Sequence, residues 1–139
     1  MATTEILLVE DNPGDVLLLS EALDRSGWDC HLTVLRNGAD ALAYLFRREK
    51  HAQAIRPHLI LLDLNLPLVS GYEVLEEVKK DAGLASIPLA LLSGSASEPA
   101  RGSCLSADRC FIKPMVFLGY VSMVERLQAL TGSPDLQES

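Results

Sequence analysis

The sequence predicts an α/β fold in which helices cover both faces of a parallel β-sheet. Short runs of leucine and β-branched residues alternate with longer amphipathic stretches, which is typical of βαβ units. The run at residues 59–62 is apolar at every position, as expected of a central parallel strand covered on both faces. With 139 residues, 48% apolar and 22% charged, the chain fits one globular domain. Together these observations predict a three-layer α/β/α sandwich.

The first half of the chain contains the signals for two strands and two helices. A strand is expected at residues 5–9, and Pro13 suits the first turn of the helix that follows it. Gly27 ends that helix, and a second strand fits residues 30–35. An Asn-Gly turn at Gly38 leads into the second helix, after which a polar connection follows.

The second half continues the alternation. After the strand at residues 59–62, Ser70 and Glu73 have the spacing of a capping box and predict the start of a helix. The fourth strand is expected at residues 88–92. Residues 95–108 contain a proline and a glycine, so any helix there is expected to be short or frayed.

The C-terminal region is predicted to hold one strand and one long helix. The strand is expected at residues 109–112 and the helix at residues 116–130. We therefore expect a domain over residues 1–131 with a short tail at residues 132–139, which leaves no room for a DNA-binding or enzymatic output domain.

Composition excludes several classes of function. The chain has 12 basic and 19 acidic residues and a net charge of −7, which argues against nucleic acid as a direct partner. No apolar run approaches the roughly 20 residues that cross a bilayer, and no signal peptide is evident, so we expect a cytoplasmic protein without membrane association. Cys30, Cys104 and Cys110 have neither disulfide-framework nor zinc-site spacing.

Polar residues follow four of the five expected strands. They are Glu10 and Asp11, Asp63, Ser93 and Gly94, and Lys113 and Pro114. Each alone is more often a turn, a helix cap or a solvated charge. Because ligands of open parallel sheets bind beyond the carboxyl ends of the strands, their joint occurrence at one edge indicates a single site.

Phosphoryl transfer explains these residue types together. Clustered carboxylates repel unless a cation compensates, and Mg²⁺ prefers such oxygen ligands. Asp63 can act as a carboxylate nucleophile and form an acyl phosphate. Lys113 and the cation would stabilise the transferring group. The Ser93 hydroxyl can donate to a phosphoryl oxygen, and Gly94 leaves an open approach.

These motifs resemble the response-regulator receiver family over residues 6–130. Glu10-Asp11 matches the acidic pair, Asp63 the phosphorylated aspartate within Leu-Leu-Asp-Leu-Asn-Leu-Pro, Ser93 the Thr/Ser position, and Lys113-Pro114 the Lys-Pro pair. The resemblance implies a flavodoxin-like sandwich with strand order 2-1-3-4-5.

The same resemblance implies a ligand set and a backbone feature. Mg²⁺ would be bound by Asp11 and Asp63, through water by Glu10, and by the main-chain carbonyl of Asn65. A cis peptide bond would precede Pro114.

A narrower resemblance concerns single-domain regulators paired with bacterial and cyanobacterial phytochromes. It lies in residues 9–15, 47–57 and 63–67. It implies a sensor histidine kinase as partner, with a bacteriophytochrome as the specific candidate, and a homodimer. In the last helix, Phe117, Tyr120, Val121 and Val124 can face the core, whereas Leu118 and Met123 lie partly off that stripe.

One departure from the family pattern concerns the aromatic residue that usually stands three positions before the lysine. Cys110 occupies this position, and Phe111 should point to the opposite face of the sheet. The usual rotamer switch is therefore in doubt, whereas the phosphorylation chemistry is not.

The expected function is that of a single-domain response regulator in a two-component phosphorelay. A histidine kinase would phosphorylate Asp63, and the chain would catalyse only its own phosphorylation and dephosphorylation. The surface or the dimer would then change, most of all at residues 93–101.

Two alternatives remain. One is a pseudo-receiver, a binding module that never accepts phosphate. The other is an Asp-nucleophile phosphatase of the haloacid dehalogenase type. Asn65 in place of a second acid, and the position of Asp63 on the third strand, argue against the phosphatase.

Overall fold

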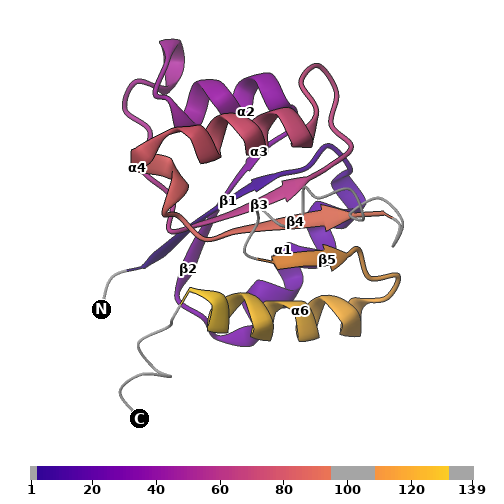
Figure 1. Cartoon of the computed structure of the whole chain (residues 1–139). Helices are drawn as coiled ribbons and strands as arrows, with labels where there is room; N and C mark the ends of the chain where they lie inside the picture. Colours follow the sequence, from indigo (N-terminus) through magenta and orange to yellow (C-terminus); the bar gives the residue numbers. More distant parts are fainter. Residues whose placement is uncertain (1–2, 95–108, 132–139) are drawn as a thin grey trace.

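A five-stranded parallel sheet lies between two layers of helices (Figure 1). The computed structural model describes residues 3–94 and 109–131. The strands are β1 (Thr4–Val9), β2 (Cys30–Leu35), β3 (Leu59–Asp63), β4 (Leu89–Ser93) and β5 (Arg109–Ile112). The helices are α1 (Pro13–Ser26), α2 (Gly38–Leu45), α3 (Gly71–Lys80), α4 (Ala82–Ala85) and α6 (Phe117–Leu130), and a 3₁₀ turn spans Glu49–His51. The strand order is β2-β1-β3-β4-β5, which confirms the predicted sandwich.

The two faces of the sheet have separate cores. Alternate residues of β1 show this, because Ile6 and Leu8 pack toward α1 and α6, whereas Leu7 and Val9 pack toward α2, α3 and α4. The strands β3 and β4 are buried at every position. The two residues that end these strands, Asp63 and Ser93, are therefore also buried.

Local capping signals begin and end the helices as the sequence indicates. The Asn12 side chain accepts hydrogen bonds from the first turn of α1, and Gly27 ends that helix with a φ of 78°. Ser70 and Glu73 form the predicted capping box of α3.

The structure differs from the prediction at two helices. The four-residue helix α4 was not predicted, because it is too short to show a periodicity, although Asp81 caps it. Met123 of α6 is buried, so the expectation that it lies partly off the core was wrong. The buried face of α6 is broad because this helix packs against both α1 and the sheet. Leu118 is exposed, as expected.

The C-terminal edge strand β5 also corrects an expectation about cysteines. Cys110 is disulfide-bonded, whereas Cys30 is a free thiol. Phe111 and Cys110 lie on opposite faces of β5, as predicted from strand alternation. The expectations for residues 95–108, for most of the segment 93–101 and for the tail 132–139 fall outside the described part of the chain.

Candidate functional site

The acidic residues predicted to converge do so at the carboxyl end of the sheet. Glu10 follows β1, Asp63 ends β3, and Asp11 stands between β1 and α1. Each of the three offers a carboxylate oxygen, and these oxygens all lie within 4.8 Å of one another. Glu10 and Asp63 are buried, with 1% and 2% of their surface exposed, whereas Asp11 is exposed.

The backbone of Asp63 is held on both sides. The amide of the next residue, Leu64, donates to the carbonyl of Leu92 on β4 at 3.0 Å, which extends the strand pairing past the acid. At the start of α3, Gly71 lies so close that a Cβ there would collide with the Asp63 carbonyl oxygen. The Asn65 amide donates to Asp63 Oδ1 at 3.1 Å and orients the carboxylate.

The loop after Asp63 also contacts α2. Gly38 begins α2, and a Cβ at this position would collide with the backbone of Val69. The Gly38 amide donates to the Pro67 carbonyl at 3.4 Å. The loop between β3 and α3 is therefore packed closely against the first turn of α2.

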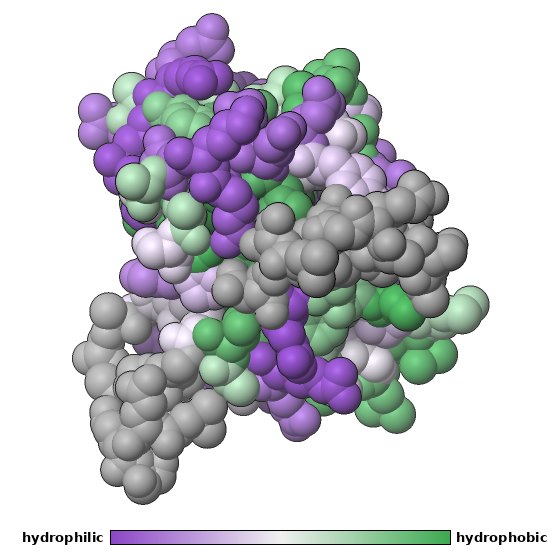
Figure 2. Space-filling view, in the orientation of Figure 1, coloured by the Kyte–Doolittle hydropathy of each residue, from purple (hydrophilic) through white to green (hydrophobic). Residues whose placement is uncertain are grey.

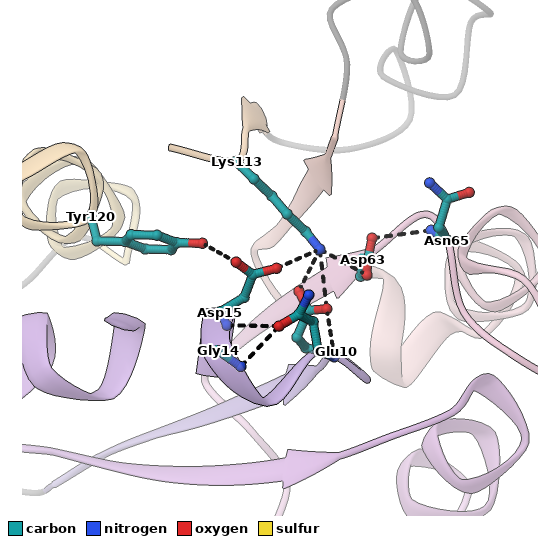
Figure 3. A network of polar contacts seen from close by, with 8 residues as sticks. Glu10, Gly14, Asp15, Asp63, Asn65, Lys113 and Tyr120 are labelled. Atoms are coloured by element: carbon teal, nitrogen blue, oxygen red, sulfur yellow. Dashed lines mark hydrogen bonds and ion pairs between the residues drawn. The ribbon is translucent and has the colours of Figure 1, made fainter. Parts of the chain in front are cut away.

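Lys113, which follows β5, brings an ammonium group to the acids (Figure 3). Its Nζ lies 2.9 Å from Glu10 Oε1, 3.1 Å from Asp63 Oδ2 and 3.1 Å from Asp15 Oδ2. The Lys113 amide donates to the Ser93 carbonyl at 2.7 Å, which ties the base of the side chain to the end of β4. The predicted meeting of Asp11, Asp63 and Lys113 at one edge is confirmed.

The environment of these groups shifts the pKa values of Glu10 and Lys113. Burial raises the pKa of Glu10 to about 7, with the neighbouring Asp63 adding to this effect and Lys113 opposing it. Burial alone would lower the pKa of Lys113, but the surrounding carboxylates Glu10, Asp15 and Asp63 outweigh it and raise this pKa. The ammonium therefore stays charged beside the acids.

The three acids Glu10, Asp11 and Asp63, here called the acidic triad, fit a hard divalent cation. The buried Glu10 Oε1 makes no hydrogen bond, although it lies 2.9 Å from the Lys113 ammonium as an ion pair. Asp11 adds an exposed carboxylate to the buried pair. Clustered carboxylate oxygens, one of them without a hydrogen bond, are the ligands that Mg²⁺ or Mn²⁺ prefers.

The remaining predicted residues surround this centre, with one correction. Ser93 is buried at the end of β4, and Gly94 is exposed with open space at its Cβ position. Among the described residues no peptide bond is cis, so the cis bond expected before Pro114 is wrong for this structure. The trans form is intrinsically favoured by about 0.5–1 kcal/mol, and Lys113 reaches the acids without the cis isomer.

Two residues of the site were not predicted. Asp15, in the first turn of α1, contacts Lys113, and the Tyr120 hydroxyl of α6 donates to the other oxygen of Asp15 at 3.1 Å. Burial and the charge of Asp15 raise the pKa of Tyr120, so it remains a donor. No pattern in the sequence marks these two residues as part of the site, because their contact depends on how α1 packs against α6.

In the part of the chain that the structure describes, no helix has the length and apolarity to cross a membrane.

Comparison with known proteins identifies the family of this fold and site. The model of the response regulator receiver domain matches residues 6–117. Response regulator Rcp1 of Synechocystis sp. (strain ATCC 27184 / PCC 6803 / Kazusa) is 45% identical over 93 residues, covering 67% of this chain. The match covers 63% of Rcp1, so it spans less than two thirds of that protein.

Solved structures of relatives superpose closely. The phosphorylated cyanobacterial phytochrome response regulator RcpA has a TM-score of 0.86 at 36% identity, covering 95% of this chain and 96% of its own. The Mn²⁺-bound form of Rcp1 has a TM-score of 0.82 at 35% identity, covering 91% and 92%. The bacteriophytochrome response regulator RtBRR has a TM-score of 0.78 at 37% identity, covering 91% and 78%.

The acidic triad of this chain resembles a receiver metal site. The matched family is a receiver domain and not a classical enzyme family. With the family model matched over residues 6–117, the chain belongs to the response regulator receiver domain family of two-component signalling, and its relatives include phytochrome response regulators.

Proposed function

We propose that this chain is a single-domain response regulator that accepts a phosphoryl group on Asp63 from a sensor histidine kinase, with Mg²⁺ as cofactor. The observation that carries the proposal is the meeting of an acidic triad and an ammonium group at the buried end of β3. We further propose that residues 1–131 act as the receiver, with 132–139 as a tail, and that the protein works in the cytoplasm.

The proposed phosphoryl transfer is a nucleophilic displacement at phosphorus. An Asp63 carboxylate oxygen attacks the phosphorus of a phosphohistidine, and the new O–P bond gives an acyl phosphate. The P–N bond breaks, and its electron pair returns to the imidazole nitrogen of the kinase, which is free to take up a proton. The kinase histidine is thereby regenerated.

The residues around Asp63 have separate roles in this proposal. Glu10, Asp11, Asp63 and the Asn65 carbonyl would hold Mg²⁺. When bound, the ion neutralises charge on the phosphoryl oxygens and orients them. Lys113 pairs with a phosphoryl oxygen from the other side. The Ser93 hydroxyl donates to a further oxygen, and the open space at Gly94 admits the donor.

A phytochrome-type kinase is the specific partner we propose. RcpA and RtBRR are phytochrome response regulators, and both resemble this chain over nine tenths of its length, at 95% and 91%. The mixture of a purified bacteriophytochrome kinase, ATP and this chain should transfer phosphate to Asp63. Transfer from unrelated kinases at equal rates would contradict this pairing.

We also propose a homodimer. Exposed apolar side chains gather at the end of β5 and the start of α6, namely Ile112, Met115, Val116 and Leu118. Figure 2 displays apolar surface beside β5 and α6, whereas the surface over α2 and α3 is mostly hydrophilic. Sedimentation of the wild type and of Leu118→Gln tests this, because a dimer that buries Leu118 should weaken in the variant.

The deciding experiment is incubation with acetyl phosphate and Mg²⁺ followed by intact mass measurement. We expect one phosphoryl adduct, which Asp63→Asn abolishes and a chelator prevents, while Asp24→Asn on the exposed side of α1 leaves it unchanged. Absence of any adduct would support the pseudo-receiver instead. Continuous release of phosphate from diverse phosphoesters would favour the phosphatase.

A further inference from the structure

Lys113 has one partner that does not belong to the acidic triad. Its ammonium contacts Glu10 and Asp63, which are members of the triad, and Asp15, which is not. Asp15 comes from the first turn of α1, and only its Oδ2 faces the ammonium. It therefore offers the ammonium a carboxylate that a cation at the triad does not require.

The Asp15 carboxylate is oriented from the other side by α6. The Tyr120 hydroxyl donates to Asp15 Oδ1 at 3.1 Å, so one oxygen is held by the phenol while the other faces Lys113 (Figure 3). Tyr120 is buried in the core between α1, α6 and the sheet, which fixes its ring. Asp15 and Lys113 are themselves mostly covered, with side-chain exposures of 24% and 18%.

The strand β5, which precedes Lys113, does little to fix the Lys113 side chain. Ile112 and Met115, on either side of the Lys113-Pro114 pair, are exposed, and β5 is the edge strand of the sheet. A lysine side chain carries about 2 kcal/mol of rotamer entropy, so its ammonium needs side-chain partners to stay in one place. When the oxygens of Glu10 and Asp63 turn to a cation, Asp15 is the remaining carboxylate among those that contact the ammonium in the described residues.

We propose that Asp15, oriented by Tyr120, is a positioning residue that keeps the Lys113 ammonium at the rim of the site once Glu10 and Asp63 ligate the cation. This inference rests on the proposed phosphorylation of Asp63. Its consequence is that α6 is connected to the phosphoryl-binding group through Asp15, on the face of the sheet opposite Cys110.

A purely electrostatic role and a positioning role of Asp15 predict opposite effects of removing its carboxylate. A carboxylate close to an incoming phosphoryl group repels it, so its neutralisation should speed phosphorylation if Asp15 acts only through its field. If Asp15 positions Lys113, its neutralisation should slow phosphorylation, because the ammonium loses a fixed location. The sign of the change therefore separates the two roles.

The kinetic test uses acetyl phosphate at saturating Mg²⁺, with the Mg²⁺ titration of each variant recorded separately. Asp15→Asn should slow the maximal phosphorylation rate about tenfold, and Tyr120→Phe, which keeps the charge of Asp15, about threefold. Asp15→Glu should restore part of the rate, because a carboxylate returns. Glu21→Gln, which removes an exposed acid further along α1, should have no effect.

A second readout does not involve phosphorylation. In the Mg²⁺-loaded protein, the NMR signal of the Lys113 ammonium protons should remain visible because Asp15 slows their exchange with water. In Asp15→Asn and Tyr120→Phe this signal should broaden or vanish, while the thermal unfolding temperature of Tyr120→Phe reports whether the fold is retained.

The outcomes are distinguishable. If the wild type takes no phosphoryl group, the proposed function fails. If the wild type is phosphorylated but Asp15→Asn is equally fast or faster, or if the Lys113 signal is unchanged in both variants, the positioning role is refuted. A slower Asp15→Asn with a lost ammonium signal supports it.

Discussion

The two halves of the site are fixed in different ways. The acids stand at the ends of β1 and β3, which are inner strands, and the backbone of Asp63 is held by β4 and by Gly71. The ammonium stands at the end of β5, an edge strand whose Ile112 is exposed. The core therefore places the acids, whereas side-chain partners place the ammonium.

Substitutions in the acid half should therefore act through stability, whereas those in the ammonium half should act through chemistry. Around Asp63, a change in backbone packing should unfold the protein before it alters the site. Around Lys113, a change in side-chain partners should alter protonation and cation binding while the sheet stays intact.

Gly71→Ala should be the most disruptive change in the acid half. Its Cβ would collide with the Asp63 carbonyl oxygen, which the strand ladder holds in place, so the free energy of unfolding should fall by about 3 kcal/mol. Denaturant unfolding measures it. Gly94→Ala is the matched control, because nothing lies within 4 Å of its Cβ position. Equal stability of the two variants would contradict a rigid acid half.

Lys113→Ala should destabilise the Mg²⁺-free protein by about 2 kcal/mol at a pH above the pKa of Glu10. The buried carboxylates of Glu10 and Asp63 then lose the ammonium that compensates them. Added Mg²⁺ should restore the stability, and its affinity should rise because the competing ammonium is gone. Lys80→Ala, which removes an exposed pair with Glu77, should change little. Failure of Mg²⁺ to rescue Lys113→Ala would refute the account.

Mg²⁺ affinity should increase about tenfold between about pH 6 and pH 8, because the ion requires the Glu10 carboxylate and burial raises the pKa of this group to about 7. Stability of the ion-free protein should change in the opposite direction. Because the pKa of Glu10 is higher in the folded state than the unfolded value of 4.5, Glu10 contributes to the stability of the fold below pH 4.5. This contribution is lost as the pH rises through about 7. Calorimetric titration at several pH values measures the affinity, and a flat profile would contradict the shift.

Ser70→Ala should have the smallest effect, about 1 kcal/mol, because it removes the capping box at the start of α3 but no packing. Thermal unfolding measures the loss. Ser70→Thr, which keeps a hydroxyl, should recover most of it. A change in phosphorylation rate larger than the change in stability would indicate that the cap also positions the loop after Asp63.

The sequence predicted most of the acid half and less of the ammonium half for a physical reason. Strands of a parallel sheet end at a common edge, so Glu10 and Asp63 had to be neighbours once the strands were recognised. Lys113 followed from the same rule. Asp15 and Tyr120 could not be predicted as site residues, because their contact depends on how α1 packs against α6, which periodicity does not specify.

Two further differences have the same origin. The helix α4 is determined by a cap and a single turn, and such short elements leave no periodic signal. The burial of Met123 depends on the packing of α6 against α1, which is a tertiary contact. Strand positions, in contrast, were predicted closely because each strand is rich in apolar and β-branched residues and is followed by a polar or turn signal.

The contact between Gly38 and Val69 has a consequence for how a change at Asp63 travels. With no room between the start of α2 and the backbone of the β3–α3 loop, Val69 cannot be displaced toward α2 without pushing the whole helix outward. We therefore expect a shift of this loop to reach α2, on the side of the molecule that is mostly hydrophilic in Figure 2. We expect a change at Asp63 to reach both helix layers, α2 through Val69 and α6 through Lys113 and Asp15.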